Sequence, residues 1–190
     1  MFVSGCRSRS SRRKQNVDKT PPIRVFVRQP FTESGDVEKR IIQGVLDVIG
    51  SLNVDVLTGL EAQSQDTFRQ SFETNTGLPF TPRNFRTARL SILGSVDVMI
   101  VIRTGLSESG AFEVAYNVFG GRRVPMFFAV WQNAPIKTTL LRELDEFCQA
   151  EYRVFEHPEE LRASLAAFLD RAARPARRFA KVHSANRTAA

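Results

Sequence analysis

The stretch VDVMIVIRTGLSESGAFEVAYNVFGGRRVPMFFAV, residues 96–130, decides the fold of this 190-residue chain. It begins with an almost unbroken apolar run, which is typical of a strand covered on both faces. A polar turn follows, in which Ser107 or Ser109 can cap a helix that ends at Gly120 and Gly121. Residues 124–130 return to a strand pattern. A strand, helix and strand of this length make a right-handed crossover, so the sheet is predicted to be parallel.

The same alternation continues on both sides of this stretch. Further strands are predicted at 23–27, 54–57 and 152–155, with helices at 36–49, 84–93, 138–149 and from Pro158 onward. Residues 59–82 have weak periodicity, which is typical either of a lid over a site or of a partly helical insertion. Five strands alternating with helices predict an α/β fold with a doubly wound, flavodoxin/Rossmann-like parallel sheet in the order 2-1-3-4-5.

This strand order places two loops opposite each other. The loops 28–35 and 103–110 follow the first and third strands and should face each other across one crevice, where such sheets bind their ligands. Backbone N–H groups at the helix start, with the hydroxyls of Ser107 and Ser109, could bind a phosphate there, and Gly110 allows close approach. Ordinary helix capping is the alternative.

Glu113 is the candidate catalytic residue. It lies one turn into the helix, off the predicted apolar stripe of Ala111, Phe112, Ala115, Val118 and Phe119. A carboxylate that projects into the crevice could attack an anomeric carbon and form a glycosyl-enzyme. The alternative is a solvent-facing acid that the helix dipole favours.

Charge and composition exclude several classes of protein. The net charge is +7, but residues 25–170 hold 14 basic and 19 acidic residues. The predicted organisation is a disordered basic tail (1–22), one α/β domain (23–172) and a basic C-terminal tail (173–190), so no specific nucleic-acid partner is expected. No apolar run is long enough for a transmembrane helix, and no signal-peptide pattern is present, so no membrane partner is expected.

The sequence gives no sign of a metal or cofactor. The two cysteines and two histidines are isolated, so neither a metal cluster nor a disulfide framework is predicted, which fits a cytoplasmic location. No phosphate-loop or dinucleotide glycine motif is present, so no cofactor is expected.

Residues 23–31 (IRVFVRQPF) and 96–130 together resemble the nucleoside 2-deoxyribosyltransferase-like superfamily, which includes the 2′-deoxynucleoside 5′-monophosphate N-glycosidases. The matching features are Pro30 and Phe31 after the first strand, residues 96–98, Gly110 with Glu113, and residues 121–125 before the fourth strand. The resemblance implies that Glu113 is the nucleophile and that Ser107 binds phosphate, which favours a nucleotide over a free nucleoside. It also implies a nucleotide-processing domain and leaves assembly into a homo-oligomer open.

Two positions depart from the family pattern. Arg89 stands where the family has an acid, and Arg28 and Gln29 replace the glycine of the first loop. An arginine can bind phosphate but cannot act as a general base. The predicted substrate-binding residues are therefore Arg28, Gln29, Phe31, Arg89, Ser107, Ser109 and Gly110, with Phe31 able to stack on a base.

The expected function is an N-glycosidase or N-deoxyribosyltransferase that cleaves the base–sugar bond of a nucleotide, preferably a 5′-monophosphate, or of a nucleoside. Two alternatives remain: a non-catalytic nucleotide sensor of the same fold, and an NAD glycohydrolase similar to Toll/interleukin-receptor-like domains.

Overall fold

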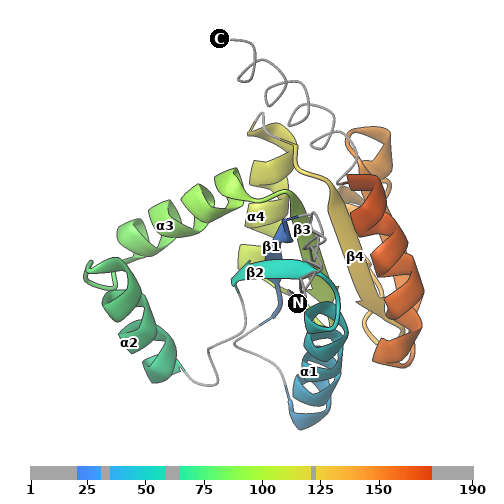
Figure 1. The fold of residues 1–190 in the computed structure, drawn as a ribbon, viewed down its shortest axis with the longest axis horizontal. Helices are drawn as coiled ribbons and strands as arrows, with labels where there is room; N and C mark the ends of the chain where they lie inside the picture. The colour runs from blue at the N-terminus through green and yellow to red at the C-terminus, as the bar shows by residue number, and fades with distance from the viewer. Residues whose placement is uncertain (1–20, 31–34, 59–64, 121–122, 173–190) are drawn as a thin grey trace, which may run out of the picture.

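A computed structural model describes residues 21–30, 35–58, 65–120 and 123–172 of the chain (Figure 1). The predicted disorder of the two tails therefore falls almost entirely outside the described residues, as does Phe31. The prediction of a single domain for 23–172 stays a prediction.

The fold is built on one parallel sheet of five strands. These are β1 (Ile23–Arg28), β2 (Val54–Thr58), β3 (Val98–Arg103), β4 (Met126–Trp131) and β5 (Ala150–Phe155). All pairs are parallel, and the order is β2-β1-β3-β4-β5, which confirms the predicted doubly wound α/β topology. The first five residues of β3 are buried, as its unbroken apolar run predicts for a central strand.

Helices cover both faces of the sheet. On one face, α1 (Asp36–Gly50) and the C-terminal helical residues 161–172 pack on the inward side chains of the strands, including Val27, Ile100 and Phe127. On the other face, α4 (Glu108–Phe119) and the end of α3 (Pro82–Ser95) enclose Phe26, Met99 and Phe128. None of the helices among the described residues is long and apolar enough to span a membrane.

The segment after β2 is partly helical. It contains α2 (Gln65–Thr76) and leads into α3, and the two helices project away from the sheet (Figure 1). Where the two helices meet, three aromatic rings pack against one another, with centroids 5.5–5.9 Å apart; they belong to Phe72, Phe80 and Phe85. The described part of the segment therefore agrees with the partly helical alternative, while residues 59–64 lie outside the described residues.

Helix α3 is longer than predicted. It begins at Pro82 because the Thr81 side chain caps it by accepting a hydrogen bond from the Asn84 N–H. It also runs past Leu93, the last residue of the predicted helix, to Ser95.

The predicted helix at 138–149 is wrong. The structure has two short 3-10 turns, at Thr139–Leu141 and Leu144–Glu146, separated by Glu143 with a left-handed backbone (φ 56°). The Tyr152 hydroxyl holds this break, because it donates to the Leu141 carbonyl and accepts from the Leu144 N–H. A tertiary contact therefore overrides an apolar spacing that favours a helix.

Candidate active site

The carboxyl ends of β1 and β3 bring the two predicted loops together. Arg28, the last residue of β1, is paired with Val101 of β3. Helix α4 starts a few residues after β3, and Ser107 is its N-cap, since its hydroxyl accepts a hydrogen bond from the Gly110 N–H at 3.1 Å. The first turn of α4 therefore lies beside the end of β1, as the strand order predicts.

The buried face of α4 is not the predicted one. Phe112 and Phe119, assigned to the apolar stripe, are 52% and 80% exposed, whereas Glu113 and Asn117 are buried. Asn117 occupies its position because its amide bonds both the N–H and the carbonyl of Val124, at 3.1 and 2.9 Å. The alternative of a solvent-facing Glu113 is thus wrong.

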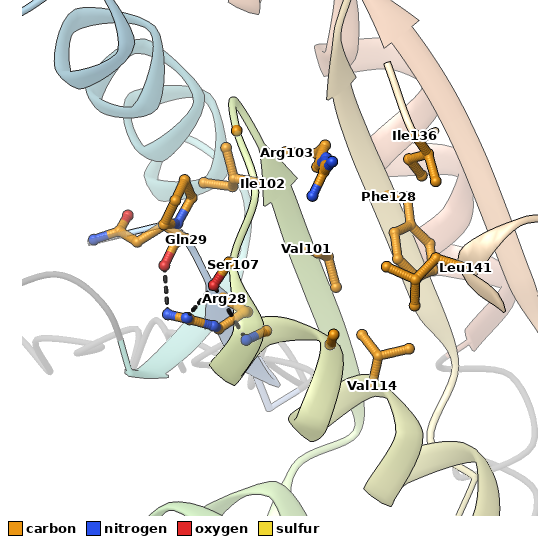
Figure 2. Close-up of a pocket in the computed structure, with 14 residues that line it drawn as sticks. Arg28, Gln29, Val101, Ile102, Arg103, Ser107, Val114, Phe128, Ile136 and Leu141 are labelled. Atoms are coloured by element: carbon orange, nitrogen blue, oxygen red, sulfur yellow. Dashed lines mark hydrogen bonds between the residues drawn. The ribbon is translucent and has the colours of Figure 1, made fainter. Parts of the chain in front are cut away.

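Arg28 joins β1 to the start of α4. Its Nη2 donates to the Ser107 and Ser109 hydroxyls at 2.5 and 2.7 Å, and its Nη1 donates to the Gln29 carbonyl at 2.5 Å (Figure 2). A Cβ on Gly110 would lie 3.2 Å from the Arg28 Nε and 3.1 Å from the Ser107 Oγ. Gly110 therefore leaves room for the guanidinium to approach the helix.

Glu113 lies between two guanidinium groups. Its Oε1 accepts a hydrogen bond from the Arg89 Nε at 2.9 Å, and its Oε2 is 3.2 Å from the Arg28 Nε. The side chains of Glu113, Arg28 and Arg89 are only 8%, 11% and 14% exposed. This Arg28–Glu113–Arg89 group, called the triad below, carries one more positive than negative charge.

The two arginines are held in different ways. The Arg89 guanidinium stacks over the ring of Phe26, with its carbon 4.3 Å from the centroid, and lies 6.0 Å from the Phe85 centroid. Burial lowers the pKa of Arg28, while the negative charge of Glu113 raises it and the positive charge of Arg89 lowers it further. An arginine pKa stays far enough above neutrality for Arg28 to remain a cation.

A small cavity of about 30 Å³ lies beside Arg28 and Ser107 (Figure 2). Its apolar wall includes Val101, Val114, Phe128, Ile136 and Leu141, and Glu113 does not line it. Arg103 lines it as well, and burial lowers the pKa of this residue. The sequence analysis did not include Arg103 among the site residues. Its position at the carboxyl end of a buried strand could have indicated it, because ligands of parallel sheets bind at these strand ends.

Most of the predicted site residues come together. Arg28, Arg89, Glu113, Ser107, Ser109 and Gly110 form one connected cluster, and Gln29 is among the residues that line the cavity. Phe31 lies outside the described residues. Within the described ranges, no three His, Cys, Asp or Glu residues gather in a way that could hold a metal ion.

Comparison with known proteins identifies the fold. No protein-family model matches the sequence, and no curated protein is significantly similar to it. Among solved structures, the CMP N-glycosidase BcmB from Clostridium botulinum is similar, with a TM-score of 0.54 and 14% identity over 76% of this chain and 98% of that one. A conserved protein from Enterococcus faecalis V583 aligns more weakly, with a TM-score of 0.43 and 9% identity over 79% and 98% of the two chains. The chain thus has a nucleoside 2-deoxyribosyltransferase-like fold, as the sequence resemblance predicted.

Proposed function

We propose that this protein cleaves the base–sugar bond of a nucleotide, as an N-glycosidase or an N-deoxyribosyltransferase, with Glu113 as the nucleophile. The observation behind the proposal is the buried carboxylate of Glu113, near the start of α4. This helix begins at the carboxyl ends of β1 and β3, where the strand order reverses and such sheets bind their ligands. The shared fold with a protein named as a CMP N-glycosidase supports the same class of reaction.

The chemistry follows from the carboxylate. An oxygen of Glu113 attacks C1′ of the sugar, and the base leaves with the electron pair of the glycosidic bond. Water then attacks C1′ of the glycosyl-enzyme, the ester bond to Glu113 breaks, and the proton of the water goes to the departed base, so the sugar phosphate is released and the carboxylate is restored. Alternatively, a second base attacks C1′ and the sugar is transferred. Neither arginine acts as a general base, because a guanidinium does not give up its proton in the working pH range.

A 5′-monophosphate is the favoured substrate. Arg28, Ser107 and Ser109 supply a cation and two hydroxyls beside the N-terminus of α4, where the helix dipole also favours an anion. We assign Gln29 and Arg89 to the same substrate site, and Phe31 keeps its predicted role of stacking on the base. The hypothesis of a homo-oligomer and a cytoplasmic location is retained as part of this proposal.

A non-catalytic nucleotide-binding module is the second candidate. The observation that favours it is the occupation of both Glu113 oxygens by arginines, one of them at the position where the family has an acid. A carboxylate that is held by two cations is a poorer nucleophile, so a protein that only binds a nucleotide is consistent with the triad.

The deciding experiment is chromatographic detection of free base. The purified chain is incubated with a panel of ribo- and deoxynucleotides, the matching nucleosides, and NAD, whose product would be nicotinamide. Base release that is lost in Glu113→Ala and kept in Glu108→Ala is the expected result, since Glu108 is an exposed acid in the first turn of the same helix.

Two results would contradict the proposal. Base release at an unchanged rate in folded Glu113→Ala would remove Glu113 as the nucleophile. A folded wild-type chain that releases no base from any member of the panel, but gains thermal stability with a nucleotide, would establish the binding module.

A further inference from the structure

The groups suited to bind a phosphate are bonded to one another in this structure. The Nη2 group of Arg28 donates to both the Ser107 and the Ser109 hydroxyl, and the Ser107 hydroxyl also accepts the Gly110 N–H. A phosphate that uses these groups must therefore enter between the guanidinium and the two serines. Arg28 has to change its partners when the anion binds.

One of those partners is Glu113, and this contact is the weaker side of the triad. The Arg28 Nε and the Glu113 Oε2 are 3.2 Å apart, yet both atoms are buried and neither makes a hydrogen bond among the described residues. In contrast, Arg89 makes an aligned hydrogen bond to Glu113 and is stacked on Phe26. Arg28 is thus the arginine that can be withdrawn, while Arg89 keeps the carboxylate in place.

The geometry of the guanidinium links the two contacts. Arginine binds a phosphate most strongly through two parallel N–H groups along one edge of its planar fork. The Nη1 group of Arg28 is bonded to the Gln29 carbonyl, so the edge formed by Nε and Nη2 is the one that faces the serines and Glu113. A phosphate on this edge engages the Nε–H that now lies beside Glu113 without an aligned hydrogen bond to it.

The charges favour this exchange. The triad has two cations and one carboxylate, all largely buried, so it has an uncompensated positive charge. A phosphate dianion attracts Arg28 more strongly than the single charge of Glu113 does. Its arrival also compensates the excess charge of the site.

We propose that Arg28 is a phosphate-operated latch on Glu113: the phosphate of the substrate takes over the Nε and Nη2 edge of Arg28 and thereby frees one oxygen of Glu113. Arg28 is then a specificity-determining residue, because a ligand without a phosphate leaves Glu113 paired. This inference rests on the proposed function for its catalytic consequence, but the exchange of partners itself can be measured without catalysis.

The test is a double-mutant cycle on phosphate binding. The affinity of the full chain for inorganic phosphate is measured by calorimetry for the wild type, Glu113→Gln, Arg28→Gln and the double variant. Glu113→Gln removes the carboxylate that competes for Arg28, so it should tighten phosphate binding by about tenfold when Arg28 is present. This is a typical size for the coupling between two linked binding events. In the Arg28→Gln background, the same change should alter the affinity by less than about twofold.

Controls separate the latch from a general charge effect. The Arg24–Asp97 pair is a matched control, because Arg24 lies on the same strand and is paired with a carboxylate at 3.1 Å, away from the site. Asp97→Asn should leave phosphate affinity unchanged. If Arg28→Gln does not fold, Arg28→Lys replaces it in the cycle, since a single ammonium cannot offer two donors along one edge.

The outcomes distinguish this inference from the proposed function. An equal effect of Glu113→Gln in both backgrounds, or no phosphate binding to the wild type, overturns the latch. Base release without the coupling leaves the glycosidase proposal standing and removes the latch. Coupling without base release from any nucleotide supports the latch and contradicts the glycosidase proposal.

The kinetic consequence provides a second readout. If base is released, the nucleotide should exceed the matching nucleoside in kcat as well as in kcat/KM, because the phosphate frees the nucleophile in addition to binding. Inorganic phosphite should raise the turnover of the nucleoside in a saturable way. Equal kcat values for nucleotide and nucleoside, with no effect of phosphite, would overturn the latch.

Discussion

Replacement of Arg89 by leucine should destabilise the protein strongly, because it leaves the buried Glu113 with one aligned partner fewer. The hydrogen bond that is lost is 2.9 Å long, and the two side chains are 14% and 8% exposed. Losing a hydrogen bond to a charged group costs about 1.5–3 kcal/mol, and the lost stacking on Phe26 adds about 1 kcal/mol. Arg28 still faces the carboxylate and offsets part of this loss. We therefore expect a decrease of about 2–3 kcal/mol in the free energy of unfolding.

The assay is urea unfolding followed by the fluorescence of Trp131, the single tryptophan, which packs against the core at the end of β4. Arg24→Leu is the control, since the side chains of Arg24 and its partner Asp97 are 46% and 33% exposed and their pair should be worth less than about 1 kcal/mol. In a Glu113→Gln background, the cost of Arg89→Leu should fall by about 2 kcal/mol, because the charge that Arg89 compensates is gone.

Two results would show that the Arg89–Glu113 ion pair does not stabilise the fold. If Arg89→Leu costs no more than Arg24→Leu, the triad does not hold the site together. If Arg89→Leu costs the same in the wild-type and in the Glu113→Gln background, the loss comes from packing on Phe26 and not from the ion pair.

Three further changes have defined outcomes. Asn117→Leu should cost about 2–4 kcal/mol in urea unfolding, because the buried N–H and carbonyl of Val124 lose their partners, and faster amide hydrogen exchange at Val124 should accompany it. Gly44→Ala should cost about 1–3 kcal/mol, since a Cβ there would lie 2.7 Å from the Pro158 ring; an unchanged midpoint would show that the contact relaxes freely. Burial raises the pKa of both Cys148 and Tyr152 in the native state, so the unfolded chain loses these protons first and the free energy of unfolding should fall as the pH rises above about 8.5. Tyr152→Phe should flatten the part of this decline above about pH 10, and an unaltered slope would contradict the assignment.

The parallel sheet could be predicted because its strands are dictated by local pattern. The apolar run before Arg103 can be buried only as a central strand, and the polar turn at Ser107 and the two glycines after Phe119 bound the crossover helix. Strand order then followed from general rules of chain connection. The backbone conformation around Glu143 could not be predicted from local pattern. It is fixed by the hydroxyl of Tyr152, which belongs to β5, further along the sequence.

The site was predictable only in part, for a physical reason. Topology alone placed Arg28 opposite Ser107, and the structure has them in direct contact. The burial of Glu113 and Asn117 was missed because hydrophobic periodicity counts apolar residues, and these polar residues are buried only because partners on other elements satisfy them. The contact of Arg89 with Glu113 depends on how α3 leans on β1, which no local pattern of the sequence reports.

The proposed nucleophile can be tested directly by mapping the covalent intermediate. The wild-type chain is mixed with the nucleotide that it cleaves, quenched with acid within one turnover, and digested for mass spectrometry. We expect a sugar phosphate ester on the peptide that contains Glu113, which disappears on longer incubation and is absent from Glu113→Gln. Base release with no adduct on that peptide, or with an adduct on another carboxylate, would show that Glu113 is not the nucleophile.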